Sequence, residues 1–188
     1  MQKFLIKAVR SLESLSEQVG RAAAWLTVFM VVVTFAVVLL RYVFDMGWIA
    51  MQESVTYMHA AVFMLGAAFT FKREGHVRVD VFYRNFGPRG RALVDIIGGL
   101  FLLIPIAAFI IWSSWNYVGD SWRVFEGSRE AGGLPLVYWL KTLIPVMALL
   151  MLAQGVADIA RNALLLAGVD LSVEEMRAEP VDEQGDAI

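Results

Sequence analysis

Long apolar stretches alternate with short charged segments along the whole chain. No charged side chain falls within residues 22–40, 54–71, 96–119 or 142–157. Each stretch is close to the roughly 20 residues with which a helix crosses about 30 Å of hydrocarbon. The pattern predicts an all-α integral membrane protein with four transmembrane helices, at about residues 22–44, 48–71, 92–118 and 135–160.

The segments flanking these spans predict a helix before them and a tail after them. In residues 1–21, apolar side chains recur at helical spacing on one face, namely Phe4, Ala8, Leu12, Leu15 and Val19. We expect an amphipathic helix in the headgroup plane, the alternative being a cytoplasmic extension of the first span, with a bend permitted at Gly20. Residues 161–188 are acidic and lack apolar periodicity, which predicts a disordered cytoplasmic tail.

Two prolines bear on the third span. Gly87 and Pro88 indicate where its helix starts, because proline fits the first turn of a helix. Pro105 lies further along, where we expect a kink. A span that starts at Pro88 is longer than the hydrocarbon requires, so it should tilt or protrude.

The basic residues predict the orientation. Of the 16 Lys and Arg residues, twelve fall before the first span, between the second and third, or after the fourth, and four fall on the other side. Because cytoplasmic loops carry the excess of Lys and Arg, both termini should face the cytoplasm. The chain is then a multi-pass membrane protein.

Composition excludes several function classes. The chain is 59% hydrophobic, and its four spans leave no segment long enough for a soluble catalytic domain. It has no cysteine, which excludes thiolate chemistry. The formal net charge of −2 is unevenly distributed and carries no information about nucleic acid; we expect no nucleic-acid partner. His59 and His76 are 17 positions apart, about 25 Å along a helix, and so cannot share a haem iron. We expect no enzyme, no catalytic residue, no cofactor and no metal site.

Charged residues near the ends of the spans are candidate structural or subunit-interface groups. Arg41 follows the first span, Trp48 and Glu53 open the second, and Lys141 starts the fourth. An Arg41–Glu53 ion pair would fasten the first hairpin, whereas the alternative is two separately solvated interfacial charges. We favour a structural pair or a subunit contact over a substrate site.

His59 lies deeper in the second span. Gln52, His59, Gly66 and Thr70 fall on one helical stripe, and such polar and small residues favour contact between helices in lipid. We therefore interpret His59 as a packing histidine, with a proton relay as the alternative.

Several short motifs occur in an order that resembles a known family. They are Arg41-Tyr42-Val43-Phe44, Trp48, Glu53, Leu65-Gly66-Ala67-Ala68, Gly75-His76-Val77-Arg78-Val79-Asp80, Gly133-Leu134-Pro135 and Pro145. The order resembles the small membrane subunit, DctQ-like, of tripartite ATP-independent periplasmic (TRAP) transporters, over about residues 22–160. Gln52-Glu53 departs from the carboxylate pair of many members. His59, within Tyr57-Met58-His59-Ala60, resembles a branch for 2-oxo acid or mannitol/chloroaromatic-type systems rather than the C4-dicarboxylate branch.

The resemblance implies that the chain is one of three components of a transporter in a bacterial inner membrane. A periplasmic substrate-binding protein captures an organic acid, a large multi-span permease carries it with sodium coupling, and the small subunit braces that permease. It adds His76, Arg78 and Asp80 to the candidate interface residues. Two alternatives remain open, a homodimeric four-span exporter that uses Glu53 as its coupling carboxylate, and a membrane assembly factor.

Overall fold

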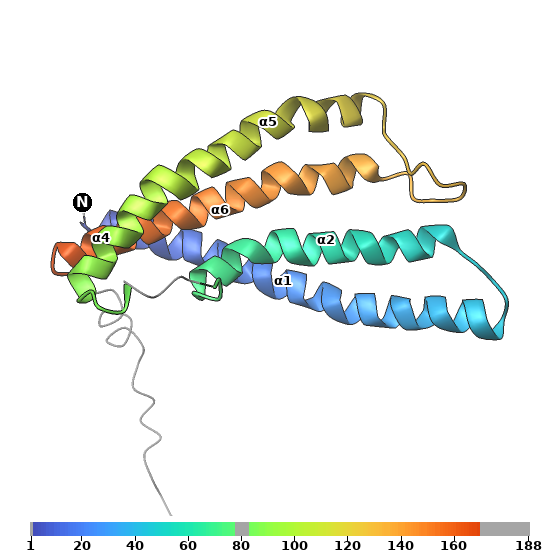
Figure 1. The fold of residues 1–188 in the computed structure, drawn as a ribbon, viewed down its shortest axis with the longest axis horizontal. Coiled ribbons are helices and arrows are strands. Elements are labelled where there is room, and N and C mark those ends of the chain that lie inside the picture. Colours follow the sequence, from blue (N-terminus) through green and yellow to red (C-terminus); the bar gives the residue numbers. More distant parts are fainter. Residues whose placement is uncertain (1, 78–82, 170–188) are drawn as a thin grey trace, which may run out of the picture.

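The computed structural model describes residues 2–77 and 83–169, whose regular elements are all helices, without a strand. Figure 1 shows the elements, which are α1 (Gln2–Val43), α2 (Ile49–Lys72), α4 (Pro88–Gly98), the π-helical turn η1 (Gly99–Leu103), α5 (Ile104–Arg123) and α6 (Val137–Leu166). α4, η1 and α5 form one helical segment, so the described chain has four helices long and apolar enough to cross a membrane. The predicted all-α, four-span fold is confirmed.

The helices form an open row rather than a closed bundle. α6 packs against α1, α2, α4 and α5, whereas α1 also lies along α2. In Figure 1, α6 runs between α5 and α2. We call the end where α1 begins and α6 finishes the terminal end, and the end with the connections 44–48 and 124–136 the loop end.

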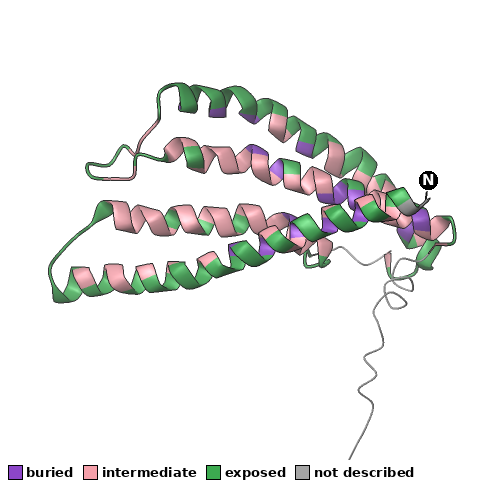
Figure 2. Cartoon of the chain, turned by 180° about the vertical axis from the view of Figure 1, so that it is seen from behind, coloured by how far each residue is buried: buried purple, intermediate pink, exposed green. Residues whose placement is uncertain are grey.

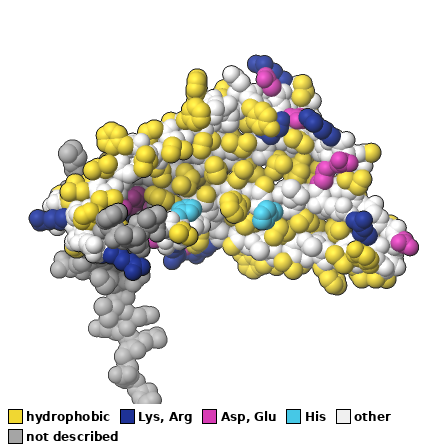
Figure 3. Space-filling model, in the orientation of Figure 1, with side chains coloured by type: hydrophobic (Ala, Val, Ile, Leu, Met, Phe, Trp, Pro, Cys, Tyr) yellow, Lys and Arg dark blue, Asp and Glu magenta, His cyan; other side chains and the backbone are white. Residues whose placement is uncertain are grey.

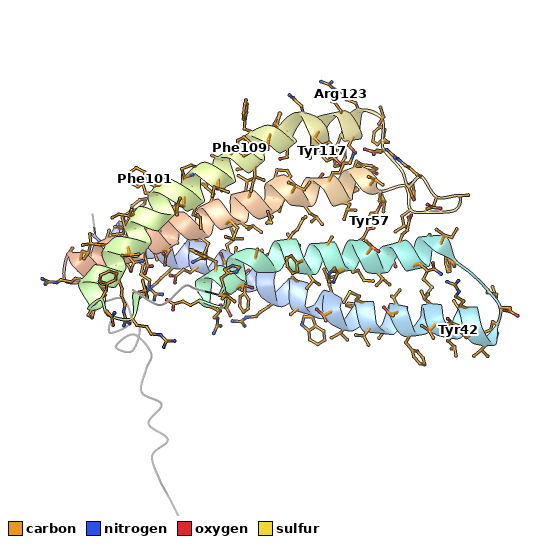
Figure 4. The ribbon with its side chains drawn as sticks, in the orientation of Figure 1. Tyr42, Tyr57, Phe101, Phe109, Tyr117 and Arg123 are labelled. Atoms are coloured by element: carbon orange, nitrogen blue, oxygen red, sulfur yellow. The ribbon has the colours of Figure 1, made fainter. Side chains whose placement is uncertain are left out.

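Small residues make the helix contacts, and large apolar ones point outward. The most buried positions include Ala68, Ala148 and Ala157, each at most 1% exposed, while Phe101 and Phe109 are 67% and 60% exposed. Figure 2 shows the buried positions concentrated toward the terminal end, and Figure 4 shows Phe101 and Phe109 pointing away from α6. This distribution suits a lipid environment, where close backbone packing replaces a hydrophobic core.

The first helix differs from the prediction. α1 is one helix of 42 residues with no break at Gly20, so residues 2–21 continue the first span, which was the alternative. Gly20 lies against α2, where an added Cβ would approach Phe69 Cβ to 2.5 Å. Because this contact holds the two helices side by side, the segment runs along α2 instead of bending away.

The buried face of this segment also differs from the predicted apolar stripe. Val9, Ser16 and Glu13 are 1%, 2% and 7% exposed, whereas Phe4 and Leu15 are 79% and 45% exposed. Val9 packs with Ala157 and Leu164 of α6, and of the predicted stripe Leu12 packs against this cluster. The acidic side chains of the segment also turn inward, because the neighbouring helices offer ionic partners to Glu13 and Glu17, as described below.

The third span accommodates its proline by widening one turn. Gly87 is the N-cap and Pro88 the first residue of α4, as predicted. The π turn Gly99–Leu103 immediately precedes Pro105, and the N–H of Ile104 bonds to the carbonyl of Gly99. Proline cannot donate to the preceding turn and its ring crowds the carbonyl four residues before, so a wider turn relieves that clash. The segment bends there in Figure 1.

The boundaries of the other spans are close to the prediction. α2 and α6 start within two residues of the predicted positions, and α6 runs to Leu166, beyond the predicted 160. It ends where Gly168, at φ 84°, lets the Val169 N–H bond back to the Leu164 carbonyl at 2.9 Å. Arg78, Asp80 and most of the acidic tail lie outside the described residues, and the domain division stays a prediction.

Candidate functional site

The end of α5 positions an acidic side chain that the sequence analysis did not single out. Phe125 takes a left-handed conformation, at φ 46°, so the N–H of Glu126 bonds to the carbonyl of Ser121 at 3.0 Å. The same turn brings the Ser121 hydroxyl to donate to the Glu126 carboxylate at 2.7 Å. Glu126 is thus folded back over the last turn of α5.

Lys141 of α6 is the ionic partner of Glu126. Its ammonium donates to the same carboxylate oxygen and lies 4.0 Å from the centre of the Tyr117 ring. The Lys141 side chain is 15% exposed, so this pair is better shielded than a surface ion pair. The candidate Lys141 therefore ties the start of α6 to the end of α5.

This pairing predicts acid sensitivity. The hydrogen bonds from Lys141 and then Ser121 hold the pKa of Glu126 below its ordinary value of 4.5. A group whose pKa is lowered on folding contributes stability above its unfolded pKa and loses it as the pH falls through the folded one. Purified protein should therefore melt at lower temperature as the pH drops below 4.5.

The acid effect has a matched control. Glu126→Gln should melt with a smaller acid-induced drop than the unchanged chain, whereas Glu130→Gln, at an exposed glutamate of the same loop, should follow the unchanged chain. Equal drops in all three proteins would remove Glu126 as a source of the acid sensitivity.

Glu53 of α2 holds the loop between α5 and α6. One carboxylate oxygen accepts from the Ser128 hydroxyl, and the other accepts from the Leu134 N–H at 2.7 Å. The loop is itself ordered, because the Ser128 N–H donates to the Leu134 carbonyl at 2.9 Å. Gly133 fits here because an added Cβ would lie 2.5 Å from the Ser128 hydroxyl and 2.8 Å from the Glu53 carboxylate.

The expected Arg41–Glu53 pair is replaced by this arrangement. Among the described residues, the polar contacts of Glu53 go to the loop, and Arg41 is exposed at the end of α1. The reason is that residues 124–136 fold back over the start of α2 and bring a hydroxyl and an N–H to the carboxylate. We call Glu53, Ser128, Leu134, Ser121, Glu126 and Lys141 the loop-end clamp.

The other two candidates near the start of α2 lie beside this clamp. Trp48 is the N-cap residue of α2 and is 62% exposed, while Gln52 is half-buried. Tyr57 of α2, one turn deeper than Glu53, lies on the side facing α6 (Figure 4), and its buried hydroxyl has no hydrogen-bond partner among the described residues. Sequence reasoning missed Tyr57 because only its place between helices marks it.

A second ionic cluster joins the helices at the terminal end. Glu17 of α1 accepts from Lys72 and Arg73 at the end of α2, at 3.0 and 2.6 Å. Glu13, one turn earlier, is paired with Arg161 of α6 at 3.5 Å. We call these five residues the terminal-end clamp. It explains why the acidic face of α1, rather than its apolar stripe, turns inward.

His59 is not packed within this chain. It is exposed on α2, with its ring 6.3 Å from that of Phe63, and an added Cβ at Gly66 would meet no atom within 4 Å. His76 is also exposed, and its Nε2 lies 3.4 Å from the Ala67 carbonyl. The stripe predicted to contact another helix therefore faces outward in the described chain, and the packing role of His59 stays a prediction.

A groove opens between α2 and α5 toward the terminal end. It has a volume of about 570 Å³ and is lined by mostly apolar residues of α2, α4, η1, α5 and α6, with Asp95 and Asp158 also lining it. We call it the α2–α5 groove. Within residues 2–77 and 83–169, no group of three or more His, Asp or Glu side chains is placed to hold a metal ion.

Gln154 is a buried polar residue that sequence reasoning also missed. It lies in α6, is 2% exposed, and its Oε1 has no hydrogen-bond partner within residues 2–77 and 83–169. The signal was available, because Gln154 is a polar residue within the fourth charge-free stretch.

The comparisons with known proteins agree with one another on the family. The profile of the family described as tripartite ATP-independent periplasmic transporters, DctQ component, matches residues 30–165. A C4-dicarboxylate TRAP transporter small permease protein DctQ from Vibrio cholerae is 29% identical over 61% of this chain and 48% of its own length. A protein from Haemophilus influenzae named as a TRAP transporter small permease is 33% identical over 46% of this chain and 53% of its own length.

The matches cover only part of each relative. The aligned part of the chain spans about half the length of both curated relatives, and no solved structure matches. The name of the Vibrio relative refers to C4-dicarboxylates, so it gives no support to the 2-oxo acid branch suggested by His59. The profile match covers most of the region from α1 to α6. The chain therefore belongs to the family of DctQ components of TRAP transporters.

Proposed function

We propose that this chain braces the large multi-span permease of a TRAP transporter, as a fixed companion in sodium-coupled, binding-protein-dependent uptake of organic acids. Family membership supports the transport role, because the family is one of transporter subunits rather than enzymes. Four apolar helices in such a family indicate a multi-pass inner-membrane protein.

The observation that carries the proposal is that both ends of the helix row are clamped. Glu53 and Lys141 tie α2 and α6 to the connection after α5 at the loop end, and Glu17 ties α1 to α2 at the terminal end. Transporters that alternate access move one group of helices against another around a midplane site, often made by broken helices. A row held at both ends suits a part that stays still while another moves.

The position of Glu53 disfavours the exporter alternative. A coupling carboxylate should be deep in the membrane and free to exchange its ion. Glu53 lies in the first turns of α2, and both of its oxygens accept hydrogen bonds from the loop. Because Glu53 holds the loop 124–136 in place, its role supports a chain that accompanies the permease rather than one that carries substrate itself.

The charge bias supports an orientation for the complex. With the termini in the cytoplasm, as the distribution of Lys and Arg favours, the loop end would face the periplasm. The ordered loop 124–136 would then be presented to the periplasmic substrate-binding protein, and the terminal-end clamp would lie at the cytoplasmic surface.

Co-purification tests this proposal. The tagged chain, expressed with the large permease from the same organism and extracted in mild detergent, should elute with that permease at one-to-one stoichiometry, as measured by native mass spectrometry. Recovery as a dimer of the 21.0 kDa chain would favour the exporter. A finished transporter that lacks the chain would indicate an assembly factor, and either result would overturn the bracing role.

A further inference from the structure

We propose that the exposed side of α2 carrying Thr56, His59 and Phe63 is the surface on which a transmembrane helix of the large permease docks, with His59 hydrogen-bonded to a polar group of that helix. We call these three residues the α2 ridge. The inference rests on the proposed function and identifies the face through which it operates.

His59 lies at a depth in the membrane where its side chain needs a polar partner. α2 has 24 residues, and His59 is ten residues after Ile49, about 15 Å along the helix. This is near the middle of a hydrocarbon layer of about 30 Å. His59 is exposed there, although an imidazole has two nitrogens that require hydrogen-bond partners and lipid tails offer none. An ionisable side chain at this depth is costly unless protein or water covers it.

The outward face of α1 lacks this requirement. α1 exposes apolar residues such as Val32 and Phe35, 59% and 67% exposed, and its exposed Thr34 donates to the Met30 carbonyl at 2.7 Å. Among the described residues of the spans, His59 is the ionisable side chain that is both exposed and near the middle. Lipid can therefore cover α1, whereas the α2 ridge calls for protein.

The shape of the neighbouring surface fits a helix. Ala67 and Phe71 continue the line of the ridge by successive helical turns, and both line the α2–α5 groove. Space beside Gly66 is open, so a neighbouring backbone can approach closely. Figure 3 shows both histidine side chains, in cyan, on one face of the molecule among hydrophobic side chains, in yellow. Ridge and groove together offer a continuous strip along α2.

The hydrogen-bonding requirement of His59 indicates what covers the α2 ridge. A lipid tail would fill the groove but leave the His59 nitrogens without partners. A second copy in a two-fold interface would bring the same patch of each chain together, and the partner ridge would offer His59 an apolar Phe63 beside its own copies of Thr56 and His59. A helix of the permease with its own polar side chain supplies His59 with a hydrogen-bond partner directly.

Site-specific cross-linking tests the docking surface. Because the chain has no cysteine, Phe63→Cys gives a single site for a benzophenone maleimide, and Phe35→Cys on α1 is a control of similar exposure, 67% against 76%. After labelling of the purified chain, reassembly with an unlabelled permease and irradiation, we expect an adduct with the permease from the Phe63 position only. An adduct from Phe35 alone, a chain-to-chain dimer from Phe63, or no protein adduct from Phe63 would overturn the proposal.

Variants at His59 test the hydrogen bond. His59→Gln keeps a donor and an acceptor, whereas His59→Leu keeps only bulk, and both variants lose the same ring contact with Phe63. We expect His59→Leu to weaken binding of the permease by at least about threefold, as one interhelical hydrogen bond in a membrane implies, and His59→Gln to bind nearly as the unchanged chain does. Equal binding by all three would exclude the hydrogen bond.

Failure of the docking surface is distinguishable from failure of the proposed function. If the unchanged chain binds the permease but the Phe63 label does not reach it, only the assigned face is wrong. If the unchanged chain does not bind the permease at all, the bracing role itself fails.

Discussion

Replacement of Glu53 by alanine is expected to release the loop 124–136 from α2 and to give the largest loss of thermal stability among single truncations in the loop-end clamp. The Ser128 hydroxyl and the Leu134 N–H would both lose their acceptor, and charged acceptors make stronger hydrogen bonds than neutral ones. The loop should also become sensitive to protease. Both effects are measurable on the purified chain in detergent, by melting and by limited proteolysis.

Two variants control this result. Glu130→Ala truncates an exposed glutamate of the same loop and should change little. Glu53→Gln keeps one carbonyl acceptor and should fall between the unchanged chain and Glu53→Ala. If Glu53→Ala and Glu130→Ala melt together and are cleaved at the same rate, the clamp does not hold the loop.

Replacement of Gly20 by alanine is expected to force α1 away from α2. The new Cβ would lie 2.5 Å from Phe69 Cβ and 2.8 Å from its Cδ2, and the Cβ cannot move without its backbone. Overpacking of this kind costs about 1–3 kcal/mol. Because Glu17 and Lys72 meet about one turn away, the terminal-end clamp should loosen as well. The free energy of unfolding in a detergent titration measures the change.

The matched control is another helical glycine. Gly119 of α5 has no atom within 4 Å of an added Cβ, so Gly119→Ala should be neutral or stabilising by up to about 1 kcal/mol, since alanine favours the helix. Combining Gly20→Ala with Phe69→Ala should restore part of the loss. A stable Gly20→Ala protein would mean that the α1–α2 contact is not close.

The spans could be predicted from sequence because a helix in lipid satisfies its backbone hydrogen bonds within its own segment, so its formation depends on that segment alone. A charge-free stretch of the right length is sufficient, and the four helices follow from it. Their partners could not be predicted in the same way. Periodicity assigned the buried face of residues 1–21 by hydrophobicity, whereas Glu13 and Glu17 face inward because basic residues of α6 and α2 lie opposite.

In the candidate site, too, the sequence identified some of the residues but not the partners that they contact. Glu53 was identified as a structural carboxylate, but its expected partner Arg41 lies close in sequence, and the actual donors lie 75 and 81 positions away. Glu126 was missed because a left-handed residue after α5 places it. His59 was found by its depth, while the side of α2 on which it lies required the structure.

Reconstituted uptake tests most directly whether the chain is a companion rather than a carrier. Liposomes would hold the small chain alone, the large permease alone or both, with an inward sodium gradient and the loaded binding protein outside. We predict substrate uptake with both subunits and none with the small chain alone. Sodium-driven uptake by liposomes that hold only the small chain would contradict the bracing role.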